Sequence, residues 1–193
     1  MIDGLWREQK ALQAAADAVY ADLGLAAALA EIGTPTRVGS AALGVMVARD
    51  LDIDVACAAL DDRTFAGVAR LGADLVRHPR VRQVQVRDDT GVWNVDPLYP
   101  DGLYLGVRYR CPDGNDWTLD IWFVDEPERQ PSTVHLGTIR PRLTDERRVA
   151  ILRIKRGLAA RGGPRVSGYD IYVAVLDEGV RTLDDFDRRL SGS

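Results

Sequence analysis

The alternation of hydrophobic and polar positions divides the chain into helical and extended segments. Apolar residues recur at helical spacing over residues 5–30, which predicts a first helix that ends before Gly33 and Pro35. Residues 61–78 repeat this spacing and have acidic residues at their start, where the helix dipole favours them. Between these segments we expect a strand at 36–40, a short helix at 40–48 and a strand at 51–58.

Beyond Pro79 the period of the pattern changes to two. Residues 81–88 and 103–111 alternate, residues 117–124 form a nearly continuous apolar run, and turn residues separate the three. We expect these strands to pair antiparallel. Prolines at 127, 131 and 141 indicate a connector, and Thr144 should begin a helix that reaches about Arg161. After a break at Gly162, Gly163 and Pro164, two helices are expected, at about 168–178 and from Thr182.

Composition narrows the class of protein. A chain of 193 residues with 46% hydrophobic residues suffices for one domain with a helical appendage. Its net charge of -4 argues against broad electrostatic attachment to nucleic acid or anionic membranes. No apolar run approaches a membrane span, and the first residues lack a signal-peptide pattern, so we expect a cytoplasmic protein. Cys57 and Cys111 are expected to be reduced thiols.

Acidic residues interrupt two of the predicted strands. Asp52 and Asp54 are two residues apart, so they project from the same face of a strand, where their mutual repulsion calls for a positive partner. A divalent cation meets that need, and bridging carboxylates suit a two-metal site. Asp50 should project from the same face, but it is a weaker candidate metal ligand because it lies at the start of the strand. Asp120, between Leu119 and Ile121, is the candidate third carboxylate.

The turn before this strand adds a candidate phosphate site. Gly39 permits close approach of a ligand to the backbone, and Ser40 suits the first position of the following helix, whose free N–H groups attract anions. We therefore expect the turn to hold phosphate and the aspartates to hold metal.

Gly39-Ser40, a short helix, Asp52-Ile53-Asp54 and a later Asp120 together resemble the nucleotidyltransferase superfamily related to DNA polymerase beta. The resemblance to the catalytic core covers about residues 30–125. It implies an α+β (α/β) fold, in which helices flank a mixed, mostly antiparallel sheet and a helical segment follows. The parts would be an N-terminal helix packed on the core (1–30), the nucleotidyltransferase core (31–126), a connector (127–142) and the helical region (143–193).

The same resemblance implies a reaction and its cofactors. Asp52, Asp54 and Asp120 would bind two Mg²⁺ ions, with Mn²⁺ as a possible substitute, and Asp120 would help to deprotonate an acceptor hydroxyl. The hydroxyl would attack the α-phosphorus of a nucleoside triphosphate (NTP), and pyrophosphate would leave.

The helical end resembles the corresponding region of template-independent polymerases in the superfamily. There a lysine and a serine contact the triphosphate and an aromatic side chain stacks on the base; the matching residues are Lys155, Ser167 and Tyr169. Lys155 is one of only two lysines in the chain. In the alternative interpretation, Lys155 is a solvated charge, Ser167 a helix cap and Tyr169 part of the core.

The acceptor is the least defined part of the prediction. The acidic net charge favours a small hydroxylated molecule; transfer to an RNA 3′ end or to a protein is the alternative, and neither DNA nor a membrane is expected as a partner. A non-catalytic nucleotide-binding or antitoxin-like module is a further alternative. Arg108 and Arg110 on one strand face, with Tyr99 and Trp117 at turn edges, are candidates for an acceptor cleft, whereas His135 is expected at the surface.

Overall fold

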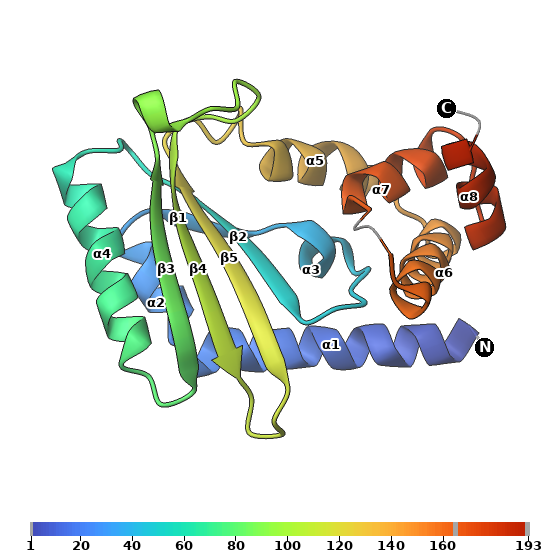
Figure 1. The fold of residues 1–193 in the computed structure, drawn as a ribbon, viewed down its shortest axis with the longest axis horizontal. Helices are drawn as coiled ribbons and strands as arrows, with labels where there is room; N and C mark the ends of the chain where they lie inside the picture. Colours follow the sequence, from blue (N-terminus) through green and yellow to red (C-terminus); the bar gives the residue numbers. More distant parts are fainter. Residues whose placement is uncertain (1, 164–165, 192–193) are drawn as a thin grey trace.

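The computed structural model describes residues 2–163 and 166–191, and its centre is a five-stranded sheet (Figure 1). The strands are β1 (Thr34–Arg37), β2 (Asp50–Ala56), β3 (Val81–Asp89), β4 (Gly102–Arg110) and β5 (Asp116–Val124). Their order is β1-β2-β5-β4-β3, and only the β2–β5 pair is parallel. The predicted mixed, mostly antiparallel sheet is therefore confirmed.

Helices cover one face of the sheet. They are α1 (Ile2–Asp22), α2 (Leu25–Ala30) and α4 (Asp62–Val76), and Figure 1 shows α1 and α2 passing behind the strands. Their apolar residues form one core with the inward-facing residues of β2, β4 and β5. Because strand side chains alternate between faces, every second residue of these strands is left on the opposite face.

The N-terminal segment differs from the single helix expected for residues 5–30. Gly24 adopts the left-handed conformation (φ 60°), which ends the first helix and lets the chain turn into α2. Leu23 and Leu25 are buried on either side of this turn. The hydrophobic spacing continues across the break, so the pattern alone did not reveal it.

Side-chain caps mark the starts of α4 and α6. Asp61 accepts a hydrogen bond from the Thr64 N–H at the start of α4, and Thr144 accepts one from the Arg147 N–H at the start of α6 (Asp145–Arg161). The predicted start at Thr144 is thus confirmed. The helix expected at 40–48 is shorter, since α3 (Gly39–Leu43) ends at Gly44.

The segment expected to be a connector contains helical structure. Residues 131–139 form α5 (Pro131–Ile139), followed by the 3-10 helix η2 (Arg140–Arg142). Pro131 occupies the first turn of α5, where a missing N–H costs no hydrogen bond, so this proline starts a helix instead of preventing one.

The C-terminal helices build a second core. These are α6, α7 (Gly168–Leu176) and α8 (Leu183–Ser191), and their apolar residues pack with Leu43 and Val45 beside α3. The helical region is therefore joined by packing to the segment that follows the Gly39-Ser40 turn. Pro164 lies outside the described residues, and none of the described helices is long and apolar enough to span a membrane.

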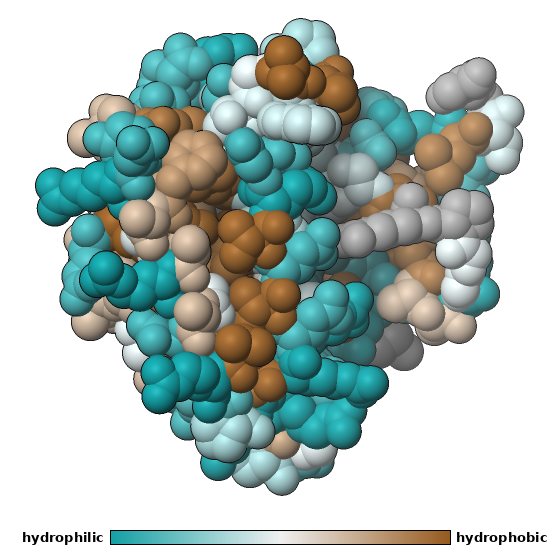
Figure 2. Space-filling view, turned by 60° about the vertical axis from the view of Figure 1, so that its left-hand side comes forward, coloured by the Kyte–Doolittle hydropathy of each residue, from teal (hydrophilic) through white to brown (hydrophobic). Residues whose placement is uncertain are grey.

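The connection between β3 and β4 carries exposed hydrophobic residues around the 3-10 helix η1 (Gly91–Trp93). Figure 2 shows hydrophobic residues among hydrophilic ones at the top of the molecule, where this connection lies. The large exposed hydrophobic residues of this stretch are Val92, Trp93, Val95, Leu98 and Tyr99.

Candidate active site

The acidic residues of β2 lie on the sheet face opposite the main core. Leu51, Ile53 and Val55 are fully buried in the core, so the strand's alternation directs Asp50, Asp52 and Asp54 to the other face. This placement agrees with the sequence prediction.

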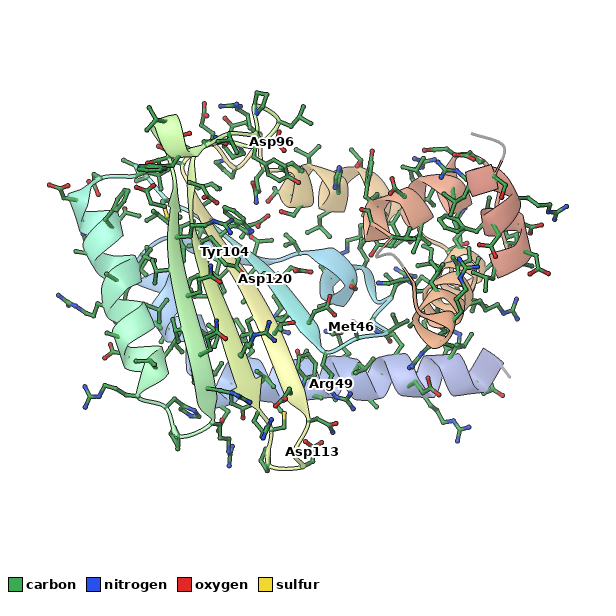
Figure 3. All side chains as sticks on the ribbon, viewed as in Figure 1. Met46, Arg49, Asp96, Tyr104, Asp113 and Asp120 are labelled. Atoms are coloured by element: carbon green, nitrogen blue, oxygen red, sulfur yellow. The ribbon has the colours of Figure 1, made fainter. Side chains whose placement is uncertain are left out.

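Asp120 stands directly beside Asp52. The parallel register of β2 and β5 pairs these two residues, and neighbouring strands lie about 4.8 Å apart. On β4, the Tyr104 hydroxyl donates a hydrogen bond to Asp120 Oδ1 at 2.5 Å, and Figure 3 shows the two side chains together on the sheet. A side chain at Gly106 would collide with the Tyr104 hydroxyl, so a glycine there allows this contact. Carboxylates from two adjoining strands thus meet as expected.

Asp52 is the most perturbed carboxylate of the group. Burial raises its pKa to about 7, and the negative charges of Asp50, Asp120 and Asp54 add to the rise, while Lys155 opposes it. The folded chain therefore keeps Asp52 partly protonated near neutral pH in the absence of a cation. A bound cation would remove this repulsion.

Asp54 is held by the segment that the sequence analysis treated as a connector. It is 3% exposed; its Oδ1 accepts a hydrogen bond from the Gln130 amide, and its Oδ2 accepts from the hydroxyls of Ser132 and Thr133, the latter at 2.8 Å. Burial raises the pKa of Asp54, and these three hydrogen bonds oppose the rise. Sequence reasoning missed all three donors, because only the fold brings the start of α5 to β2.

Carboxylate oxygens are the type of ligand that a hard divalent cation prefers, but the described side chains do not form a complete coordination shell. Within residues 2–163 and 166–191, no three His, Cys, Asp or Glu side chains are close enough to hold a metal ion as they stand. The carboxylate of Asp52 accepts no hydrogen bond there, and only one carboxylate oxygen of Asp120 is engaged. These oxygens fit Mg²⁺. The donors on Gln130, Ser132 and Thr133 already occupy most of the lone pairs of Asp54, which leaves it less available to a cation than Asp52 or Asp120.

The Gly39-Ser40 turn packs against Asp52. Gly39 has φ 61°, and a Cβ there would overlap Asp52 Oδ2, so glycine is required for two independent reasons. Ser40 does not begin α3 as expected: Val38 is the cap and Gly39 the first helical residue. With five residues, α3 is too short for its N-terminus to be a strong anion site.

Lys155 reaches this turn from α6. Its Nζ donates hydrogen bonds to Ser40 Oγ at 3.2 Å and to the Val45 carbonyl at 3.1 Å. Burial lowers the pKa of Lys155, and the negative charges of Asp50 and Asp52 counteract this. The fold thus brings a cation predicted from the helical region to the predicted phosphate turn.

A cavity of about 470 Å³ lies between the Gly39-Ser40 turn, Asp52 and Lys155. It is lined by Gly39, Ser40, Asp52, Lys155 and Tyr169, among others. Ser167 does not line it; instead its hydroxyl caps α7 by accepting a hydrogen bond from the Tyr169 N–H, which is the alternative interpretation given above.

Two residues that line the cavity were not expected to be important from the sequence. Asp50, ranked below its neighbours, has its Oδ1 buried without a hydrogen-bond partner in the described part of the chain. His135, expected at the surface, lines the cavity and stacks on Tyr169, with ring centroids 3.9 Å apart and an interplanar angle of 15°. The helical pattern of the short α5 was too weak to place His135.

The acceptor candidates separate into two groups. Trp117 is 1% exposed, because its position on β5 faces the core, so it cannot form an acceptor wall. Arg110 is paired with Asp116, whereas Arg108 is exposed and its side chain makes no ion pair or hydrogen bond within the described residues.

Comparison with known proteins identifies the fold. No family model matches the sequence, and no curated protein matches it. Among solved structures, a cytoplasmic RNA terminal U-transferase matches with a TM-score of 0.51 and 16% identity over 88% of this chain and 48% of its own. Cid1 in complex with its short product ApU matches with a TM-score of 0.52 and 14% identity over 90% of this chain and 48% of its own. A mutant of the Cid1 poly(U) polymerase bound to MgATP matches with a TM-score of 0.55 and 16% identity over 90% of this chain and 50% of its own. This chain therefore spans about half the length of these structures and has the nucleotidyltransferase fold.

Proposed function

We propose that this protein is a Mg²⁺-dependent nucleotidyltransferase that transfers a nucleoside monophosphate from an NTP to a hydroxyl at an RNA 3′ end. The observation that carries the proposal is the meeting of Asp52 and Asp120 beside a cavity that also contains Ser40 and Lys155. The carboxylates that would hold a metal ion and the buried Lys155 ammonium that would hold a phosphate lie at one place. Phosphoryl transfer requires this arrangement.

Each group has a distinct part in the reaction. Lys155 and the Ser40 hydroxyl hold the triphosphate, and Tyr169 offers its ring to the base. Asp120 accepts the proton of the attacking hydroxyl, while Tyr104 holds that carboxylate in place. Asp52 and Asp120 would hold the divalent cation, which, when bound, neutralises charge that develops on the phosphate oxygens.

An RNA acceptor is favoured over the small molecule that the net charge suggested. The structural neighbours are described as an RNA terminal U-transferase and a poly(U) polymerase, and one is bound to the short product ApU. A local surface can bind RNA whatever the overall charge. Because the structural neighbours share only 14–16% sequence identity with this chain, they support the class of acceptor and not a preferred base.

The proposal is tested by extension of a labelled RNA. The protein is incubated with single-stranded RNA, Mg²⁺ and each NTP in turn, and lengthening is followed on a denaturing gel. Wild type should add nucleotides, and Asp52→Asn and Asp120→Asn should each lose at least a hundredfold in rate. Asp74→Asn, which removes an exposed carboxylate on α4, is the matched control and should remain active. Equal rates in Asp52→Asn and wild type would refute the proposal.

The hydrogen bonds of Asp54 favour one second candidate, a nucleotide-binding module without turnover. A carboxylate committed to Gln130, Ser132 and Thr133 is less available to a cation. This candidate predicts tight NTP binding with no product from any acceptor, whereas the enzyme predicts both. A binding measurement with a fluorescent NTP analogue beside the extension assay separates them.

A further inference from the structure

The sheet has an open face beside Asp120. Figure 1 shows no helix in front of β3, β4 and β5, while α1 and α2 lie behind them. The register of these strands aligns the side chains of this face in rows across β5, β4 and β3. The face consists of Gln83, Gln85, Arg87, Tyr104, Gly106, Arg108, Thr118, Asp120 and Trp122.

This face lies on the side of Asp120 that is away from the nucleotide cavity. The cavity is lined by residues of β2, α3, α5, α6, α7 and adjacent loops, and no residue of β3, β4 or β5 contributes to it. An acceptor hydroxyl must meet the α-phosphorus opposite the leaving pyrophosphate. It therefore approaches Asp120 over β4 and β3.

An aromatic and cationic cluster stands one row from Asp120. The Tyr104 and Trp122 rings are 5.1 Å apart, and the Arg87 guanidinium lies 4.8 Å and 5.6 Å from their centroids. Asp89 fixes Arg87 from the same strand. Trp122 is two residues along β5 from Asp120, a rise of roughly 7 Å. Rings and guanidinium planes at this distance are surfaces on which unpaired bases stack.

Arg108 lies on the other side of Asp120. It pairs with Thr118 across the sheet, two residues from Asp120. Its side chain is exposed and makes no hydrogen bond or ion pair in residues 2–163 and 166–191, although its charge acts on nearby Asp116. An exposed guanidinium whose N–H groups make no protein hydrogen bond, on an open face beside the carboxylates, suits a phosphate. The face thus combines stacking surfaces with a phosphate contact, next to the carboxylate that receives the acceptor proton.

We propose that this open face of β3, β4 and β5 binds the 3′-terminal nucleotides of single-stranded RNA, with Arg87, Tyr104 and Trp122 contacting bases and Arg108 a phosphate. The inference rests on the proposed function, since it specifies the acceptor of the same site. A base-paired end would hide the base faces that this cluster needs, so the occupant is a single strand.

The test measures RNA binding without NTP by fluorescence anisotropy, using a labelled oligoadenylate of about 15 nucleotides, near the upper end of known single-strand site sizes. Trp122→Ala should weaken binding about tenfold, as expected for the loss of a stacked base, and Trp122→Phe should restore most of it. Arg108→Ala should reduce the dependence of log affinity on log salt by about 0.7, the value for one phosphate contact on a single strand. Arg70→Ala, an exposed arginine of α4 on the covered side of the sheet, should leave affinity and salt dependence unchanged.

Binding of a fluorescent NTP analogue distinguishes the two proposals. Trp122→Ala and Arg108→Ala should bind the analogue as wild type does, which also shows that they are folded. RNA binding that is absent in wild type, or unaffected by both substitutions, would overturn the inference even if NTP is still consumed with a small hydroxyl acceptor. If the two substitutions weaken RNA binding as expected but the protein never transfers a nucleotide, the result would support RNA binding by the open face and contradict the proposed function.

Discussion

Replacement of Asp52 by asparagine should stabilise the protein in the absence of a cation, by an amount that depends on pH. The pKa of Asp52 is raised to about 7 in the fold, from the ordinary value of about 4 for an exposed aspartate, mainly by burial and then by Asp50. Between these values the folded state holds a proton that the unfolded state has released, so wild-type stability falls as pH rises from about 4 to about 7. Asparagine does not titrate and escapes this loss.

The magnitude follows from the difference in proton binding. Each pH unit within the window costs about 1.4 kcal/mol, so the stability of Asp52→Asn relative to wild type should increase by about 3 kcal/mol between pH 5 and pH 8. Most of the increase should be complete near pH 7, the folded-state pKa.

Urea unfolding at both pH values, with a chelator present and far-UV circular dichroism as the signal, measures the change. Asp74→Asn is the control and should follow wild type at both. Saturating Mg²⁺ should narrow the difference, because binding at a hundred times the dissociation constant adds about 2.7 kcal/mol to wild type alone. A difference between Asp52→Asn and wild type that is the same at pH 5 and pH 8 would refute the reasoning.

Three further substitutions test other parts of the site. Lys155→Ala should weaken NTP binding at least tenfold in a fluorescence titration, whereas Lys10→Ala, which removes the only other lysine, should not; equal losses would contradict a triphosphate contact. His135→Ala should tighten binding of the same analogue severalfold, because a 3.9 Å ring separation leaves no room for a base on that face of Tyr169, and weaker binding would show instead that His135 contacts the ligand. Gly39→Ala should lower the free energy of unfolding by at least roughly 1–2 kcal/mol, the cost of its left-handed conformation, to which the overlap with Asp52 adds; urea unfolding unchanged from wild type would refute this.

Local chemistry made much of the fold and part of the site predictable. Period-two alternation located β3 and β4, a nearly continuous apolar run located β5, and the alternation within β2 put Asp52 and Asp54 on one face. The Thr144 cap marked the start of α6 because a hydroxyl that satisfies a free N–H is a local signal. These features depend on residues close together in the sequence.

The remaining features depend on contacts between distant segments. Nothing near Asp54 in the sequence indicates that Ser132 and Thr133 bind its carboxylate, because those donors are brought by α5, a helix hidden among prolines. The place of Lys155 beside Ser40 came from family resemblance and not from periodicity. A serine before a helix suits a cap as well as a ligand, so the sequence could not decide the role of Ser167.

The most direct test of the account follows the two ends of the triphosphate separately. RNA is incubated with Mg²⁺ and an NTP that carries its label on either the α- or the γ-phosphate. The account predicts that the α label enters the RNA at its 3′ end and that the γ label is released in pyrophosphate. A γ label on the acceptor, or release of the γ label as inorganic phosphate while the RNA stays unchanged, would contradict nucleotidyl transfer.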